Sequence, residues 1–232
     1  MSGELAIMAI QAAALFRLDA AGRILAINES DPSPAPRLFI GRTGEGNRWH
    51  CRHDLPESLA CEIDALLVAE LPSAELRAPL RCDKPLRALL HAHAPIAGVW
   101  SGPAWYCPAG IAAPRPVAAV QLTASTALEK HFPGWARDFV NSQPCIAVLD
   151  GDDAVAVCCS SRLSPDAAEA GAETVPGYRG RGYAASTVAA WATAIRATGR
   201  LPLYSTAWDN LASQGVARTL GLTLYGADLS FS

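Results

Sequence analysis

The chain has 232 residues, of which half are apolar and 18% are charged, and this balance excludes an intrinsically disordered protein. Its formal net charge of −3 provides no electrostatic reason to expect nucleic acid or an anionic membrane as a partner. No apolar run reaches the roughly eighteen residues that a membrane-spanning helix needs.

The N-terminal segment carries Glu4 and has no basic residue ahead of its apolar stretch, which is atypical of a secretory signal peptide. We therefore expect a cytoplasmic protein, in whose reducing environment the seven cysteines remain thiols. Cys158 and Cys159 are neighbours in an apolar run and are expected to be buried. Histidines and cysteines occur at 49–53 and 91–93 without the spacing of a zinc site, so we expect no metal.

Residues 1–107 are predicted to form a mixed α/β region. Two short strands, 15–19 and 24–27, flank a turn at Gly22 and predict a hairpin. A further strand is expected at 37–40. Residues 57–71 follow a proline and show apolar residues at helical spacing, and 86–93 predict a second helix. The region carries no chemical motif, and its role stays open.

Residues 108–116 contain three prolines and one glycine, a composition that suits neither a helix nor a central strand. We interpret this segment as a linker. The prediction is therefore an N-terminal region at 1–107 and a second domain at 117–232.

The second domain begins with a strand at 117–122 and a helix at 125–140. Strands at 145–149 and 154–159, joined by the turn 150–153, predict a hairpin. A further strand is expected at 169–175, broken by the proline and glycine that follow.

A helix at 183–197 comes next, with an apolar stripe along one side and Gly199 at its end. After a strand at 203–206, Asp209 or Asn210 caps a helix that reaches Gly221. Residues 222–232 supply one or two closing strands. This order of elements predicts an α/β (α+β) layered fold.

Residues 173–184 form a glycine-rich connection from a strand to a helix. The N–H groups at a helix start lack intrahelical partners and attract anions, as does the helix dipole. Gly180 and Gly182 let a phosphate approach the backbone, and Arg179 and Arg181 add positive charge. The segment lacks the patterns of a P-loop and of a dinucleotide-binding turn. The plainer alternative is a helix N-terminus with solvated arginines.

This segment, Arg179-Gly180-Arg181-Gly182-Tyr183-Ala184, resembles the Arg/Gln-x-x-Gly-x-Gly/Ala signature of the GCN5-related N-acetyltransferases (GNAT superfamily). A second stretch, with Asn210, Ser213 and the Leu-Gly-Leu at 220–222, is similar to the second motif of the same family. The resemblance covers residues 144–232 and extends in part over 117–141. It does not reach the first hundred residues.

The resemblance implies a mixed, mainly antiparallel central sheet flanked by helices, with the N-terminal α/β region in addition. It also implies an N-acetyltransferase that passes an acyl group directly from acetyl-CoA to an amine of a small molecule or peptide, without a metal. For the pantetheine arm of the cofactor, the resemblance implies the backbone of Thr174 and Val175 on one side and Asn210 and Ser213 on the other. For the pyrophosphate it implies Arg179, Gly180, Arg181, Gly182, Tyr183 and Ala184.

An amine acceptor has to lose a proton, so the reaction needs a base. Glu169 and Glu173 are four residues apart on one predicted strand and therefore project to the same face. Either can act as the catalytic base or hold a cationic substrate, and the alternative is a pair of solvent-facing side chains. Relatives carry a proton-donating tyrosine where this chain has Ala217. In this chain Ser213, Tyr225 or water would have to replace that tyrosine as the proton donor.

Two other functions stay open at this point. A catalytically degenerate relative would bind acyl-CoA as a sensor or regulator, and Ala217 favours that alternative. A nucleotide-binding module of another fold would bind ATP or NAD instead. Trp191, Trp208 and Tyr204 are interpreted as core aromatics. The sequence leaves open a homodimer and does not identify the acceptor amine.

Overall fold

The computed structural model describes residues 3–30 and 34–232. The chain separates into two compact units, each built from more than one stretch of sequence. The first unit contains Met1–Ala104, Thr206–Asp209 and Leu224–Ser232, and the second contains Trp105–Ser205 and Asn210–Thr223. No helix in the described ranges is long and apolar enough to cross a membrane.

The first unit is a sheet with helices on both faces. Its elements are α1 (Glu4–Leu15), β1 (Phe16–Leu18), β2 (Ile24–Ile27), β3 (Leu38–Arg42), β4 (Asn47–Cys51), α2 (Glu57–Val68), α3 (Asp83–His93), most of β5 (Val99–Tyr106) and β11 (Thr223–Phe231). Strand β3 pairs antiparallel with β4 on one side and with β11 on the other.

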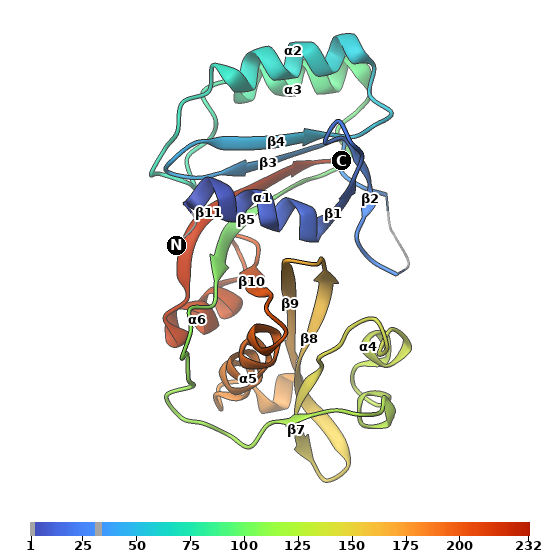
Figure 1. Cartoon of the computed structure of the whole chain (residues 1–232), viewed down its shortest axis with the longest axis vertical. Helices are drawn as coiled ribbons and strands as arrows, with labels where there is room; N and C mark the ends of the chain where they lie inside the picture. The colour runs from blue at the N-terminus through green and yellow to red at the C-terminus, as the bar shows by residue number, and fades with distance from the viewer. Residues whose placement is uncertain (1–2, 31–33) are drawn as a thin grey trace. The chain divides into compact units, whose positions relative to one another are not determined.

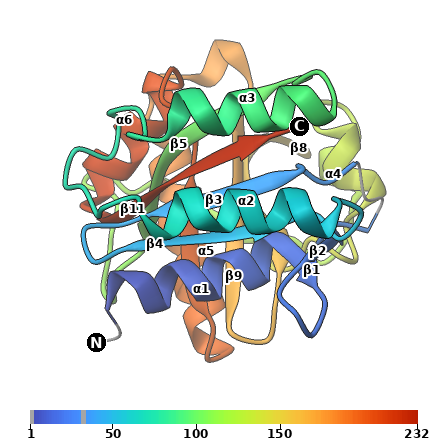
Figure 2. The ribbon, with the colours of Figure 1, turned by 90° about the horizontal axis from the view of Figure 1, so that it is seen from above.

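Helices α2 and α3 lie together on one face of this sheet, as Figures 1 and 2 show. Their buried leucines and Ile63 pack against Ile40 and Phe231 in one apolar cluster. On the other face, Met8 of α1 lies so close to Gly41 that a β-carbon there would be 2.2 Å from the methionine sulfur. The spacing of apolar residues therefore explains both layers of this unit.

Most of the elements predicted for residues 1–107 are present. The β1–β2 hairpin has its turn at Gly22 with φ 79°, and both predicted helices form, although α2 ends at Val68. Helix α1 and strands β4 and β5 were not predicted. The sequence of α1 is apolar almost all round, and its N-cap Gly3 makes no side-chain capping bond, so the usual helix signals are missing.

The second unit also consists of hydrogen-bonded strands with helices on both faces. The sheet order is β10-β9-β8-β7-β6, antiparallel except between β9 and β10. Its elements are β6 (Val120–Gln121), η1 (Thr126–Leu128), α4 (Pro133–Arg137), β7 (Ile146–Asp150), β8 (Asp153–Leu163), β9 (Ala167–Thr174), η2 (Pro176–Tyr178), α5 (Tyr183–Ala197), β10 (Leu201–Ser205) and α6 (Leu211–Leu220). The predicted mixed, mainly antiparallel sheet flanked by helices is confirmed.

The two faces of this sheet are covered by different helices. Cys158 belongs to the cluster formed with Trp191 of α5, whereas Cys159 belongs to the cluster formed with Leu128 and Phe132 on the opposite face. Successive residues of a strand point to opposite faces, so one apolar run serves both layers. Both cysteines are fully buried, as predicted.

Three predictions for this unit need correction. The helix expected at 125–140 is wrong, because the chain forms η1 and then a separate α4 that begins at Pro133. A proline disfavours helical backbone in the residue before it, and Phe132 has φ −134° and ψ 55°. The strand expected at 117–122 is limited to β6. Cys145 and Cys159, expected as thiols, form a disulfide beside the first residue pair of the β7–β8 ladder, Ile146 and Cys158.

Strands β9 and β10 separate along their length. Their parallel pairing covers Ala167–Glu169 and Leu201–Leu203 and ends there, while β9 continues to Thr174 and β10 to Ser205. Beyond Glu169 and Leu203 the two parallel strands are therefore no longer paired with each other.

Candidate functional site

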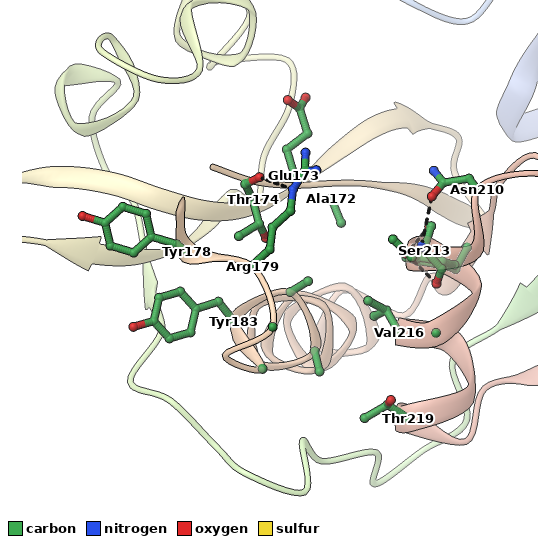
Figure 3. A pocket seen from close by; sticks show the side chains of 17 residues that line it. Ala172, Glu173, Thr174, Tyr178, Arg179, Tyr183, Asn210, Ser213, Val216 and Thr219 are labelled. Carbon is green, nitrogen blue, oxygen red and sulfur yellow. Dashed lines mark hydrogen bonds between the residues drawn. The ribbon is translucent and has the colours of Figure 1, made fainter. Parts of the chain in front are cut away.

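A cavity of about 540 Å³ lies within the second unit, beside this divergence. Its walls come from the end of β9, the following loop, the first turn of α5, the end of β10 and one face of α6 (Figure 3). The lining residues are Ala172, Glu173, Thr174, Tyr178, Arg179, Gly180, Gly182, Tyr183, Ala184, Ala185, Tyr204, Asn210, Ala212, Ser213, Gly215, Val216 and Thr219.

The loop between β9 and α5 needs glycine at two positions. Gly180 has φ 75° and Gly182 has φ 82°, both in the left-handed region that other residues adopt only with strain. Gly182 is also the N-cap of α5, where no side chain caps the helix. The first N–H groups of α5 therefore lack a helical acceptor and are available to an anion.

Both arginines of the loop are anchored to its backbone. Arg179 donates from Nε to the Thr174 carbonyl oxygen at 3.3 Å, and Arg181 donates from Nη2 to the Gly177 carbonyl oxygen at 3.1 Å. The Arg181 guanidinium also lies 5.1 Å from the ring centre of Tyr178. Each guanidinium keeps further N–H groups for a ligand. Arg179 lines the cavity, and Arg181 does not.

The glycine-rich loop borders open space beside the cavity. β-Carbons built on Gly177 and Gly180 would meet no atom within 4 Å, so the loop faces open space. Among the described residues, the Thr174 hydroxyl oxygen is buried on the cavity wall without a hydrogen-bond partner. An orphaned polar atom of this kind indicates a missing partner at this point of the wall.

Val175 follows the lining residues of β9 but is not one of them. Its N–H donates to the Val155 carbonyl oxygen at 3.0 Å, and its carbonyl accepts from the N–H of Tyr178 at 2.9 Å. Pairing between Val175 and a ligand would therefore have to use the second lone pair of the carbonyl oxygen.

The two predicted glutamates have different surroundings. Glu173 lines the cavity, is exposed, and accepts a 2.7 Å hydrogen bond from Nε1 of Trp135. Glu169 does not line the cavity and is 3% exposed. Its Oε1 accepts from the Ser205 N–H at 2.6 Å and from the Ser205 hydroxyl at 2.7 Å. Burial raises the pKa of Glu169 above its ordinary value, against the effect of the Ser205 bonds.

Trp135 covers the stretch of β9 between these glutamates. A β-carbon at Gly171 would lie 2.4 Å from an atom of the Trp135 ring, so the indole rests directly on the strand. Strand alternation puts Glu169, Gly171 and Glu173 on this face. Sequence analysis did not single out Trp135, because its contacts are with Gly171 and Glu173, which are distant from it in the sequence.

Asn210 and Ser213 lie together on the α6 wall of the cavity. Oδ1 of Asn210 accepts from the Ser213 N–H at 3.1 Å and so caps α6, as Figure 3 shows. The Ser213 hydroxyl is 2.6 Å from the Tyr204 hydroxyl, and both residues line the cavity. Tyr204 is 3% exposed, and burial raises the pKa of its phenol to about 12.

Tyr204 is a lining residue that the sequence analysis had interpreted as a core aromatic. On the strand it alternates with Leu203, which suggested simple packing, and nothing local in the sequence points to its contact with α6. Ala217 is 1% exposed and belongs to the same apolar cluster as Tyr204. The tyrosine named as a substitute, Tyr225, lies in the first unit and donates to Oε1 of Gln11 at 2.6 Å.

Residues 117–227 match a family model described as GNAT acetyltransferase. A search of curated protein sequences found no significant match.

Several solved structures have similar folds. A GCN5-related N-acetyltransferase-like protein from Streptococcus suis is 14% identical with a TM-score of 0.48, over 99% of this chain and 100% of that chain. A GNAT-family acetyltransferase from Colwellia psychrerythraea is 13% identical with a TM-score of 0.48, over 83% and 81%. A putative GNAT-family acetyltransferase from Novosphingobium aromaticivorans is 18% identical with a TM-score of 0.46, over 59% of this chain and 65% of that one, less than two thirds of its length.

Proposed function

Because residues 117–227 belong to the GNAT acetyltransferase superfamily, we propose that this chain is an acetyl-CoA-dependent N-acetyltransferase whose acceptor is an amine of a small molecule or peptide. One observation carries the proposal beyond the family. The loop with left-handed Gly180 and Gly182 opens into the cavity that continues between β9 and α6. That shape suits a pyrophosphate followed by a narrow arm.

Different residues around the cavity bind different parts of the acyl donor, acetyl-CoA. Backbone N–H groups from Gly180 to Ala184, with the two guanidinium groups, hold the pyrophosphate, whereas the Arg179 N–H donates to the Pro176 carbonyl oxygen at 3.3 Å. Thr174, Asn210 and Ser213 line the channel for the arm. Acetyl-CoA, when bound, supplies an acetyl group activated as a thioester. No metal is required by this arrangement.

Glu173 is the base in this proposal. An ammonium group has to lose a proton before its nitrogen can attack, and an exposed carboxylate near the end of β9 can accept that proton directly or through water. Support comes from its exposure, its place in the lining and its 2.7 Å bond from Trp135, which orients the carboxylate. Glu169 is enclosed by Ser205 instead, and we assign it the role of holding β9 and β10 in their diverging arrangement.

The first test is calorimetric titration of acetyl-CoA into the wild-type protein and the Arg179→Ala/Arg181→Ala variant. We expect saturable binding that the double substitution weakens by at least about tenfold, since each arginine can make charge-assisted hydrogen bonds. Arg137→Ala removes an exposed arginine of α4 that does not line the cavity, and it serves as the control. Absence of binding by the folded wild-type protein contradicts the proposal.

Acceptor amines are then screened by release of the CoA thiol. Turnover with any amine supports an enzyme, whereas tight binding without turnover across amines and amino acids supports the sensor that sequence analysis kept open. The family match does not favour that alternative. We propose no nucleic-acid or membrane partner, because the net charge is −3.

A further inference from the structure

We propose that the hydroxyl groups of Ser213 and Tyr204 form a proton-donating pair that protonates the sulfur atom released by acyl transfer. This inference rests on the proposed function and adds to it Tyr204, which neither sequence motif contains. The pair connects β10 to α6 through the 2.6 Å contact between the two hydroxyl oxygens.

The chemistry requires one proton at the sulfur. Acyl transfer forms a C–N bond to the amine and breaks the C–S bond, whose electron pair leaves with the sulfur. Glu173 takes one proton from the nitrogen, directly or through water. Ser213 gives its hydroxyl proton to the sulfur and regains one from Tyr204. Glu173 passes its proton to solvent, and Tyr204 regains one from solvent through water in the cavity. An acceptor that arrives as an ammonium ion loses one further proton to solvent before its nitrogen attacks, so no other reactant is needed.

The hydrogen bonds around Ser213 suit a donor. Its N–H is engaged by the Asn210 side chain at 3.1 Å, which fixes the serine at the first turn of α6. When the Tyr204 hydroxyl donates to the Ser213 hydroxyl oxygen, the proton on Ser213 is free to point into the cavity. The buried phenol, with a pKa of about 12, remains protonated at neutral pH.

The other phenols of the lining are directed elsewhere. Tyr178 donates to the Asp150 carboxylate, which is not part of the cavity wall. Figure 3 shows Tyr178 and Tyr183 on the far side of the α5 N-terminus from Ser213, with their rings pointing away from it. The side chain of Ala217 has no polar atom. Among the described lining residues, the Ser213–Tyr204 contact is therefore the hydroxyl pair that joins the two walls.

A binding comparison tests the pair without any turnover. The probes are CoA and desulfo-CoA, which lacks the sulfur atom, titrated calorimetrically into wild-type protein, Ser213→Ala and Tyr204→Phe. We expect the wild type to prefer CoA by roughly threefold to tenfold, the usual range for one hydrogen bond, and both variants to lose that preference. Tyr106→Phe removes a phenol hydroxyl outside the cavity lining and should keep it.

Each outcome has a distinct meaning. Equal binding of CoA and desulfo-CoA by the wild type, or an unchanged preference in both variants, overturns the pair while leaving the proposed function intact. Failure of the folded wild type to bind either probe overturns the proposed function itself and the pair with it. With a turning-over acceptor, Ser213→Ala should also lower kcat by about 10²-fold, with circular dichroism confirming that the variant is folded.

Discussion

Two glutamates of β9 show how surroundings decide the role of one side-chain type. Glu173 keeps an exposed carboxylate that accepts a hydrogen bond from a neutral donor, Trp135. Glu169 has lost its contact with water and is bonded to Ser205 across the strand divergence. A base needs access to the proton that it accepts, whereas a buried carboxyl with two donors serves to position backbone.

Glu173→Gln removes the proposed base while keeping the size of the side chain. We expect kcat to fall by roughly 10²-fold or more, with the affinity for acetyl-CoA almost unchanged. Initial rates and calorimetry on the same preparation measure both quantities. Glu129→Gln, an exposed change outside the cavity lining, is the control. A rate equal to the wild type would remove Glu173 from the mechanism.

Glu169→Gln tests the buried carboxyl through the pH dependence of stability. The pKa of Glu169 is raised in the folded state, so its stabilising contribution is complete below the unfolded value near 4.5 and is lost as pH rises through the folded value. Glutamine retains the oxygen that accepts from Ser205 but does not ionise. The free energy of unfolding of the variant, relative to the wild type, should therefore increase with pH across that window. Urea denaturation at several pH values measures it, and a constant difference contradicts the burial argument.

At the scale of elements, the loop between β9 and α5 combines a turn with an anion site. Gly180 and Gly182 adopt left-handed backbone conformations in this loop. Helix α5 then begins at Tyr183, and no side chain caps its first N–H groups. The N–H groups that make the site are the ones that a capping side chain would otherwise occupy. A change in the backbone conformation of this loop is therefore expected to change anion binding as well.

Gly182→Ala should lower both stability and acetyl-CoA affinity. A β-carbon on a residue with φ 82° costs about 1–2 kcal/mol, and relief of that strain moves the N–H groups that face the ligand. Thermal unfolding and calorimetry report the two effects. Gly134→Ala in α4, where a β-carbon meets no atom within 4 Å, controls for the added methyl group. Wild-type affinity in Gly182→Ala would show that the loop does not need this conformation.

At the scale of the whole chain, each unit is assembled from distant parts of the sequence. Strand β11, at the C-terminal end, pairs with β3 of the first unit from Ala227 to Phe231. Phe231 is fully buried among the leucines of α2 and α3. The buried Arg37 guanidinium adds bonds to the carbonyl oxygens of Leu90 and Ser232. The last residues therefore complete the core of the first unit.

Phe231→Ala should destabilise the first unit by about 3–5 kcal/mol, as for other buried aromatic side chains. Hydrogen exchange should accelerate in β3 and β11 and less in the second-unit strands β7 and β8. Leu224→Ala changes the same strand at a residue that is 46% exposed, and we expect it to have little effect. Uniform acceleration across both units would mean that they unfold together.

Much of the second unit was predictable because its signals are local. Helix α5 begins and ends where periodicity and Gly199 predicted, and Asn210 caps α6 as expected. The cavity lining includes Thr174, Arg179 and Ser213, which the motifs had selected, and Glu173, which strand alternation had selected. The helix expected at 125–140 failed because a proline within an apolar pattern outweighs helical spacing.

By itself, the sequence determined the glycine-rich turn, the helix that follows it and the family resemblance, since these depend on residues close together in the chain. Only the tertiary structure decided that Glu169 is enclosed by Ser205, that Trp135 orients Glu173, and that Tyr204 meets Ser213. The physical reason is that burial and hydrogen bonding depend on which strands and helices become neighbours. Packing over the whole domain decides which elements become neighbours, and the sequence pattern around a single residue does not record it.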